Sequence, residues 1–396
     1  MLLCVLDHAT QYDPPLWRAL AASTTLKAKV WYSLDDVPFD PELGLRASWD
    51  GVHGGYDHSH VPLKQLATSL LRLSPRPQAV MLPSWRRPQT LQVLPWARAL
   101  KIPVILCTDK TLNEPSPSGA RGHVYTALHG LRARAFDAFV TPGLLGRQYL
   151  ASLGCAYESI ATGLYPIDLA FWQAQRERLH SLSSQLRAEA PHPQPFVLVA
   201  VCKLSEREDP LRLLEAFASF ARERPDAYFI QVGDGPLRSA FEAKVRELGV
   251  ARQVKLAGFV DYKQLAAYYG AADVFAHVPA REPWGLSVLE AMACGLPVLA
   301  ATTVGAAADL VEHGQTGALA YADDPSSIAR ALALIAKDAR SMGERAAQAV
   351  RRFDVHVAAR DLAQLVERLS QRSPAAGSYG RVLFSDFRNE FGRWSP

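Results

Sequence analysis

Short apolar stretches alternate with helix-like stretches along most of this 396-residue sequence. The run Leu2–Leu6 is wholly apolar, as expected of a strand buried on both faces, and a helical pattern follows over 14–26. The alternation continues through residues 79–153 and resumes from 196 to about 369. Alternating β and α units predict parallel sheets covered by helices on both faces. We therefore expect an α/β protein with two Rossmann-like, doubly wound domains.

A change of composition separates the two series of β and α units. Residues 172–195 are rich in Gln, Arg, Ser, His and Pro, which favours a helix followed by an interdomain linker. We predict an N-terminal domain over 1–175, a linker over 176–195, a C-terminal domain over 196–372 and a tail over 373–396. Because ligands of doubly wound sheets bind beyond the carboxyl ends of the strands, the site should lie in the cleft between the domains.

The charge balance and the cysteines exclude several classes of protein. Lysine and arginine number 43 against 39 acidic residues, whereas a nucleic-acid binder carries a dense basic stripe. The five cysteines are widely spaced without a C-x-x-C pair, so they predict neither a disulfide framework nor a zinc site. The N-terminus lacks the pattern of a signal peptide, and no apolar run approaches the roughly 20 residues that span a bilayer. We expect a cytoplasmic protein with no nucleic-acid partner.

One stretch combines a glycine turn, a short helix and the start of a strand: Arg281-Glu-Pro-Trp-Gly-Leu-Ser-Val-Leu-Glu-Ala-Met-Ala-Cys-Gly-Leu-Pro-Val298. The amides of Gly285, Leu286 and Ser287 fall at the N-terminus of the predicted helix, a place suited to a phosphate. Glu282 precedes this anion site and Glu290 follows it, as a ligand with hydroxyls on both sides of a diphosphate would require. Taken alone, two glutamates at this spacing are more often ordinary residues, with Glu290 capping or solvating the helix and Glu282 in a surface loop.

The whole string resembles the donor-site motif of the retaining glycosyltransferases of family 4, which have the two-domain GT-B fold. In that family the first glutamate contacts the sugar hydroxyls and the second holds the ribose, roles that the resemblance gives to Glu282 and Glu290. The stretch Gln231–Pro236 resembles the family's strand-end glycine turn and includes Gly233. Phe259 and Val260 resemble the segment near the nucleotide base. The resemblance is strong over about 196–369 and looser in the N-terminal half.

One departure from the family pattern lies after the first strand of the C-terminal half. The family places an arginine and, five residues later, a lysine there, and both hold the diphosphate. In this sequence Lys203 takes the first position, and Glu208 takes the second. A carboxylate facing a diphosphate would repel it by about 4 kcal/mol at 4 Å in an effective dielectric near 20. We therefore expect Lys203 and the neighbouring Arg207 to hold the diphosphate, with Glu208 turned towards solvent.

The N-terminal half is expected to bind the acceptor. Asp7-His-Ala-Thr-Gln-Tyr12 follows the first strand and resembles the opening of a subgroup of these transferases, which makes His8 and Gln11 acceptor-side candidates. Trp85 and Asp109 follow other predicted strands, and Asp109 is our candidate for a catalytic group near the sugar. His123 is a further candidate. A lone histidine is more often an ordinary loop residue than a catalytic one.

The resemblance implies transfer of a hexose-type sugar from a nucleotide-diphosphate sugar, with retention of the anomeric configuration, to a saccharide, lipid-linked or other hydroxyl acceptor. Bacterial polysaccharide or glycoconjugate assembly is the implied setting. No Asp-x-Asp motif ends a strand, so we expect no metal and no cofactor, with Glu282, Asp109, Lys203 and Arg207 as the catalytic groups. Two alternatives stay open, a non-catalytic GT-B partner subunit and a nucleotide-sugar epimerase.

A basic and aromatic section of the N-terminal half suggests a further partner. Arginines and a lysine recur between Arg72 and Lys101, interspersed with Trp85 and Trp96. Such a surface suits peripheral contact with an anionic membrane, here the inner face, or with a lipid-linked acceptor. An ordinary charged face with its tryptophans packed inside is the alternative.

Overall fold

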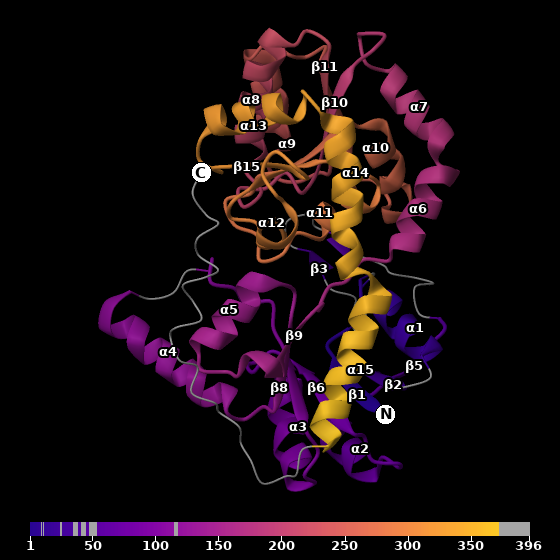
Figure 1. The fold of residues 1–396 in the computed structure, drawn as a ribbon, viewed down its shortest axis with the longest axis vertical. Helices are drawn as coiled ribbons and strands as arrows, with labels where there is room; N and C mark the ends of the chain where they lie inside the picture. Colours follow the sequence, from indigo (N-terminus) through magenta and orange to yellow (C-terminus); the bar gives the residue numbers. More distant parts are fainter. Residues whose placement is uncertain are drawn as a thin grey trace.

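The computed structural model describes residues 1–8, 10, 12–23, 26–34, 39–40, 45–46, 54–114 and 118–371. Two parallel sheets form its framework, one in the lower and one in the upper half of Figure 1. The predicted Gln11 and the tail over 373–396 lie outside the described residues.

The N-terminal sheet has seven strands in the order β5-β2-β1-β6-β7-β8-β9. Most of these strands are short and buried, as the apolar runs of the sequence predict. Their bounds are β1 Leu2–Leu6, β2 Ala28–Tyr32, β5 Asp57–His60, β6 Ala79–Pro83, β7 Val104–Cys107, β8 Ala138–Thr141 and β9 Ile160–Thr162. A small antiparallel pair, β3 (Phe39–Asp40) and β4 (Leu45–Arg46), stands apart from this sheet.

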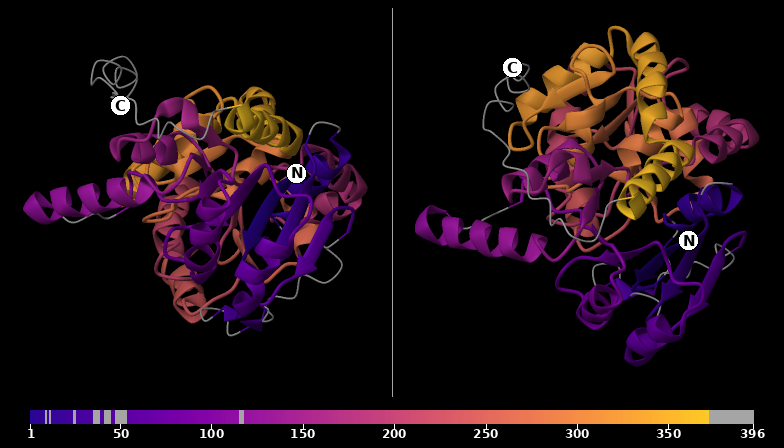
Figure 2. Two further views of the ribbon diagram at one scale, coloured as in Figure 1. Left: turned by 90° about the horizontal axis from the view of Figure 1, so that it is seen from below. Right: turned by 60° about the horizontal axis from the view of Figure 1, so that its bottom comes forward.

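Helices connect the strands of the N-terminal half, and several begin at the signals that the sequence offers. Helix α1 (Pro14–Ala22) starts at two prolines, whose fixed φ and missing N–H suit the first turn. The other bounds are η1 Leu63–Gln65, α2 Leu66–Arg72, α3 Pro88–Ala99, α4 Gly119–Ala133, α5 Leu144–Ser152 and η2 Tyr157–Ser159. Helix α4 projects away from the body of the molecule in both views of Figure 2.

The C-terminal sheet has six strands in the order β12-β11-β10-β13-β14-β15. Its strands are β10 Phe196–Val201, β11 Ala227–Val232, β12 Val254–Gly258, β13 Val274–His277, β14 Val298–Ala301 and β15 Gly317–Ala320. Its helices are α8 Pro210–Glu223, α9 Arg238–Glu247, η3 Tyr262–Gln264, α10 Leu265–Ala271, α11 Leu286–Ala293, α12 Gly305–Leu310, α13 Pro325–Ile335 and α14 Ala339–Ala349.

The strand orders fix where each sheet can bind a ligand. In both sheets the chain builds one side first and then crosses to the other, so the switch points lie between β1 and β6 and between β10 and β13. Crevices form at such points, beyond the carboxyl ends of the two strands. The two-domain, doubly wound fold predicted from the sequence is confirmed.

The domain boundaries differ from the predicted ones. Residues of the predicted linker form helices α6 (Leu169–Arg178) and α7 (His180–Ala188), which pack on α10. Trp172, placed in the N-terminal domain, is 1% exposed in the core of the C-terminal half. These helices look polar in sequence because only a narrow side of each is buried.

The last helix also crosses the predicted boundary. After η4 (Val350–Phe353), α15 (Val355–Gln371) returns to the N-terminal half and packs on α1, as the yellow helix in the lower half of Figure 1 shows. Ala358, Leu362 and Leu365 join Leu16 and Trp17 in one buried cluster. The last helix of the C-terminal domain predicted over 196–372 therefore packs in the core of the N-terminal half.

A further contact joins the two halves near the cleft. The Asp309 carboxylate of α12 accepts a hydrogen bond of 2.9 Å from the amide of Leu144, the first residue of α5. A carboxylate at a helix N-terminus is favourable, because the first amides of a helix lack partners within it. Burial nevertheless raises the pKa of Asp309 to about 6.

Among the described helices, none is both long and apolar enough to cross a membrane.

Candidate donor site

A cavity of about 240 Å³ opens at the switch point of the C-terminal sheet. The carboxyl end of β10 supplies Val201, Cys202 and Lys203, and the end of β13 supplies His277. The loop after β13 and the helix α11 complete the wall. The lining residues are Tyr12, Val201, Cys202, Lys203, Glu208, Tyr262, Leu265, His277, Glu282, Gly285, Leu286, Ser287 and Glu290. The predicted donor-site motif and the predicted diphosphate loop thus face one cavity.

The loop that carries Glu282 is held by its backbone against the loop after β14. The Glu282 amide donates to the Thr303 carbonyl at 3.3 Å, and the Gly305 amide donates to the Glu282 carbonyl at 2.9 Å. Gly305 allows this close approach, because a Cβ there would lie 1.9 Å from the Pro283 carbonyl oxygen. Two backbone hydrogen bonds, together with the close approach of the loops at Gly305, therefore position Glu282.

Replacing Gly305 by alanine should push these two loops apart. We expect the free energy of unfolding to fall by about 2 kcal/mol, within the range of overpacked sites, and sugar transfer to fall with it. Denaturant unfolding of the variant measures the effect. Gly54→Ala is the control, because no atom lies within 4 Å of a Cβ at Gly54. An unchanged unfolding midpoint for Gly305→Ala would contradict the positioning role.

The Glu282 carboxylate has two fixed hydrogen bonds at the edge of the cavity. Its Oε1 accepts from the Trp284 amide at 3.2 Å, and its Oε2 accepts from Arg207 Nη1 at 3.0 Å. The side chain keeps 16% of its surface exposed. It can therefore reach a ligand without leaving either partner.

Glu290 lies on the first turns of α11 and is buried, with 4% of its surface exposed. Its Oε2 accepts a hydrogen bond of 2.9 Å from the hydroxyl of Tyr269, which is itself fully buried. Burial raises the pKa of the Glu290 carboxyl to about 7, and the hydrogen bond from Tyr269 opposes that rise. A ligand that donates hydrogen bonds to the carboxylate would favour its ionised form.

The turn before α11 has the geometry that the sequence predicts. Gly285 precedes the helix with φ 96°, a conformation that glycine adopts without the strain a side chain would bring. The first amides of α11 have no partner within the helix, and Gly285, Leu286 and Ser287 all line the cavity. An anion in this cavity would meet the positive end of the helix.

The expectation that Glu208 turns towards solvent is wrong. Glu208 is 6% exposed and lines the cavity together with Lys203. The Arg207 guanidinium explains this placement, because it forms ion pairs with both Glu208 and Glu282. Arg207 supplies the positive charge that keeps two carboxylates close to one another at the cavity.

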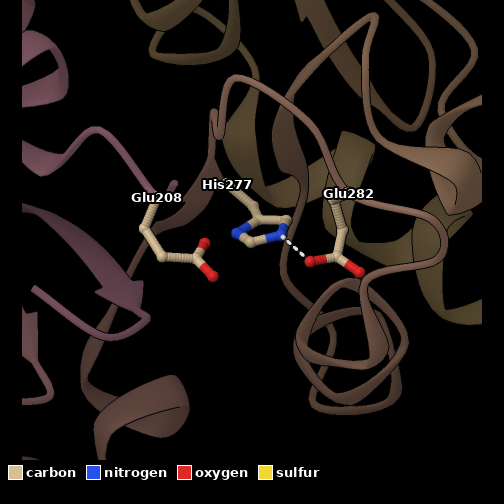
Figure 3. Close-up of side chains that lie close together, drawn as sticks. All are labelled: Glu208, His277 and Glu282. Carbon is tan, nitrogen blue, oxygen red and sulfur yellow. Dashed lines mark ion pairs between the residues drawn. The ribbon is translucent and has the colours of Figure 1, made fainter. Parts of the chain in front are cut away.

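Glu208, His277 and Glu282 form the one group of metal-ligand residues found in the described part of the chain. One potential ligand atom of each lies within 4.8 Å of the others, and Figure 3 shows the imidazole between the two carboxylates. His277 Nε2 is 4.0 Å from Glu282 Oε2. Because Arg207 bridges both carboxylates, a side chain of the protein already compensates one of their two negative charges.

A second, larger cavity of about 470 Å³ opens at the switch point of the N-terminal sheet. Its wall includes the residues after β1 and after β7, among them the predicted His8 and Asp109. Tyr12 and Leu286 line both cavities, so the two adjoin. Asp109 is exposed and stands in this cavity, away from the walls formed by Glu282 and Glu290.

Other predicted residues lie outside both cavities. His123 is exposed on the projecting helix α4, with its Nδ1 3.1 Å from the Gly119 carbonyl oxygen. Trp85 packs edge to face on His129, with ring centroids 5.0 Å apart. Phe259 is 67% exposed and Val260 packs on the C-terminal core. The Gly233 amide donates to the Gly258 carbonyl at 2.8 Å, so the glycine turn borders the segment that leads to Phe259.

Sequence reasoning missed several residues of the donor cavity, among them His277 and Tyr12, and also missed Tyr269, which lies behind the lining and contacts Glu290. His277 is the last residue of β13, and the rule that side chains at strand ends face the site would have found it. Tyr269 holds Glu290 from α10, and no local pattern marks it. Tyr12 comes from the N-terminal half and packs edge to face on Tyr262, with ring centroids 6.2 Å apart.

Known proteins match this chain in sequence and in fold. The family model for "Glycosyl transferases group 1" matches residues 184–353. The chain is 34% identical over 141 residues to N-acetyl-alpha-D-glucosaminyl L-malate synthase of Bacillus anthracis, which is 35% of this chain and 36% of that protein. It is 31% identical over 104 residues to alpha-monoglucosyldiacylglycerol synthase of Acholeplasma laidlawii, 26% of each chain. The matches thus span well under two thirds of these relatives.

Solved structures match nearly the whole chain in fold. HepE of Anabaena, determined in complex with UDP and glucose, has a TM-score of 0.67 at 20% identity and covers 94% of this chain and 99% of that one. The lipopolysaccharide outer core galactosyltransferase WaaB, in its apo form, has a TM-score of 0.68 at 12% identity over 93% and 99%. These identities support the shared fold alone.

The architecture is therefore that of the GT-B proteins, two Rossmann-like domains with cavities at facing switch points. Residues 184–353 are a glycosyl transferases group 1 domain. The resemblance to family 4 glycosyltransferases drawn from the motif around Glu282 and Glu290 is confirmed.

Proposed function

We propose that this chain is a retaining glycosyltransferase that moves a hexose-type sugar from a nucleotide-diphosphate sugar to a hydroxyl acceptor. The observation that carries the proposal is one cavity lined by Glu282 and Glu290 together with Lys203 and the first residues of α11. The carboxylates suit the hydroxyls of the sugar and the ribose, and the cation and amides suit the diphosphate. The adjoining N-terminal cavity is where we place the acceptor.

The proposed reaction uses these groups in a single transfer. Glu282 would stabilise the positive charge that develops on the sugar, and Lys203, Arg207 and the α11 amides would stabilise the negative charge on the leaving diphosphate. The leaving phosphate would take the proton of the acceptor hydroxyl as the new bond forms on the same face. Asp109 stays a candidate for a group on the acceptor side.

We also propose that the transfer needs no metal. The support is the Arg207 guanidinium, which bridges Glu208 and Glu282 at the place where a cation would otherwise have to balance them. The experiment compares sugar transfer and nucleotide binding with and without EDTA. Equal values support the proposal, and activity that returns only with added Mg²⁺ or Mn²⁺ would refute it.

We also propose that the protein is cytoplasmic and that it makes peripheral contact with the membrane.

The buried carboxylate of Glu208 favours one alternative, a non-catalytic partner subunit of the same fold. Glu208 occupies the position of a diphosphate-binding lysine and lines the cavity. A subunit of this kind would bind nucleotide weakly and transfer no sugar. Incubation with UDP-hexoses, GDP-hexoses and their acceptors separates the two functions, because release of the nucleoside diphosphate on acceptor addition occurs only in the transferase. Nothing in the described site favours an epimerase.

Replacing Arg207 by alanine tests the diphosphate contact. We expect nucleoside-diphosphate affinity to fall about tenfold, because a charge-assisted hydrogen bond is lost and the buried Glu208 carboxylate loses this ion pair. The double variant Arg207→Ala/Glu208→Ala should recover part of the loss. Titration calorimetry measures both, with the exposed Arg222→Ala of α8 as the matched control. A single variant that binds as tightly as the wild type would remove Arg207 from the site.

A further inference from the structure

The N-terminal cavity has walls of a different chemistry from those of the donor cavity. Helix α1 contributes Leu16 and Trp17, and the sheet contributes Met81, Cys107 and Val140. Helix α15 closes the opposite side with Ala358 and Leu362, and Leu286 marks the border with the donor cavity. These side chains are large or aliphatic and offer a ligand few hydrogen bonds, whereas a bare saccharide needs many.

The polar groups of this cavity gather at the strand ends, and most of the charged ones are acidic. Asp7, Asp13 and Asp109 line it, and the one arginine among the described lining residues is Arg87. Arg87 is already paired with Asp7, with 3.0 Å between Nη1 and Oδ2. Burial raises the pKa of the Asp13 carboxyl to about 6, and hydrogen bonds from the amide and the hydroxyl of Thr10 oppose that rise. Burial also lowers the pKa of His8, the other basic residue among the described lining residues. An anionic ligand would therefore meet three carboxylates and, within the described lining, an arginine that is already paired.

We propose that the acceptor is a neutral or cationic hydroxyl compound with a compact apolar group, and that this group fills the N-terminal cavity between α1, α15 and the sheet. The inference rests on the proposed function and adds to it the chemical class of the acceptor. The cavity of about 470 Å³ lies within the size of ordinary small-molecule sites, roughly 300–1,000 Å³. Its border at Tyr12 and Leu286 places the hydroxyl of such a compound towards the donor cavity.

The first test measures binding without sugar transfer. The full-length protein is titrated with n-alkanols of about two to eight carbons by calorimetry, and we expect affinity to rise about fourfold per methylene until the cavity is full. In Ala358→Leu the alkanol affinity should stop rising at a shorter chain length than in the wild type. The longest alkanols should bind this variant about tenfold more weakly. Ala363→Leu, on the same helix but outside the lining, should bind like the wild type.

The second test addresses the charge. Benzyl alcohol should bind at least tenfold more tightly than benzyl phosphate, and Asp13→Asn should narrow that ratio severalfold because one facing carboxylate is neutralised. The inference would be overturned if alkanol affinity did not depend on chain length. It would also be overturned if Ala358→Leu and Ala363→Leu had equal effects on alkanol binding, or if benzyl phosphate bound more tightly than benzyl alcohol.

The outcome of these two binding tests does not depend on whether the protein transfers sugar. Alkanol binding needs neither donor nor turnover, so a protein without transferase activity can still pass both tests. Conversely, if the protein transfers sugar but its affinity for alkanols does not depend on their length, the proposed function holds and the inference is wrong.

Discussion

Replacing Glu282 by glutamine should lower the turnover number of sugar transfer by a factor of about 10² to 10³, the usual cost of removing one electrostatic stabiliser from a transition state. Glutamine keeps the size of the side chain, but its single carbonyl oxygen can accept from only one of the two groups, the Trp284 amide or Arg207, that donate to separate oxygens of Glu282. The negative charge next to the sugar is lost, so the loss should fall on turnover and leave nucleotide affinity nearly unchanged. Single-turnover kinetics with saturating donor measures it.

A matched variant strengthens this prediction. Glu312→Gln changes a glutamate of the loop after α12, which lines neither cavity, and should leave turnover unchanged. If Glu282→Gln lost affinity and kept its turnover, Glu282 would be a binding residue without a role in the chemical step.

Replacing Glu290 by glutamine should weaken nucleotide binding about a hundredfold and, in the absence of ligand, stabilise the protein at high pH. The binding loss follows because ribose hydroxyls would donate to a carboxylate more strongly than to an amide. The stabilisation follows from burial, which raises the pKa of Glu290 from 4.5 to about 7. Glutamine keeps an oxygen that can accept from Tyr269, so that contact need not be lost.

The pH dependence of this effect has a definite sign. Below about pH 4.5 the carboxyl is protonated in both the folded and the unfolded chain and contributes nothing. Between pH 4.5 and about 7 the unfolded chain ionises first, so wild-type stability falls as the pH rises. Above pH 7 the full penalty, up to about 3 kcal/mol, is present in the wild type and absent in the variant.

Thermal or denaturant unfolding at pH 4.5 and pH 8 tests this prediction. The two proteins should unfold alike at the lower pH, and the variant should be the more stable one at the higher pH. A variant that is less stable than the wild type at both values would show that Glu290 is not held in a costly ionised state.

The sequence was sufficient where the pattern is local. Runs such as Leu2–Leu6 and Phe196–Val201 are buried on both faces, so their composition alone identifies them as strands. The donor-site string fixes the turn at Gly285, the helix after it and the spacing of its two glutamates within one continuous segment. For that reason the sequence alone places Glu282 and Glu290 in one site.

The sequence was insufficient where the outcome depends on a distant partner. Glu208 is buried because Arg207 and Glu282, which lie 75 positions apart, meet beside it. His123 was a candidate on the acceptor side, but it lies on α4, which projects away from the body of the molecule. The polar stretch 176–195 reads as a linker, although one side of α7 packs on α10 through residues such as Leu186.

The most direct test of a nucleotide-sugar site at Glu282 and Glu290 is a thermal-shift panel of UDP, GDP, ADP, CMP and dTDP with their common sugar conjugates. A nucleotide at about 100 times its dissociation constant should stabilise the folded protein by about 2.7 kcal/mol. We predict that at least one raises the melting temperature, that EDTA leaves the shift unchanged, and that Glu290→Gln reduces the stabilisation to about 0.4 kcal/mol at the same nucleotide concentration. Silence of the wild type across the whole panel would contradict the assignment.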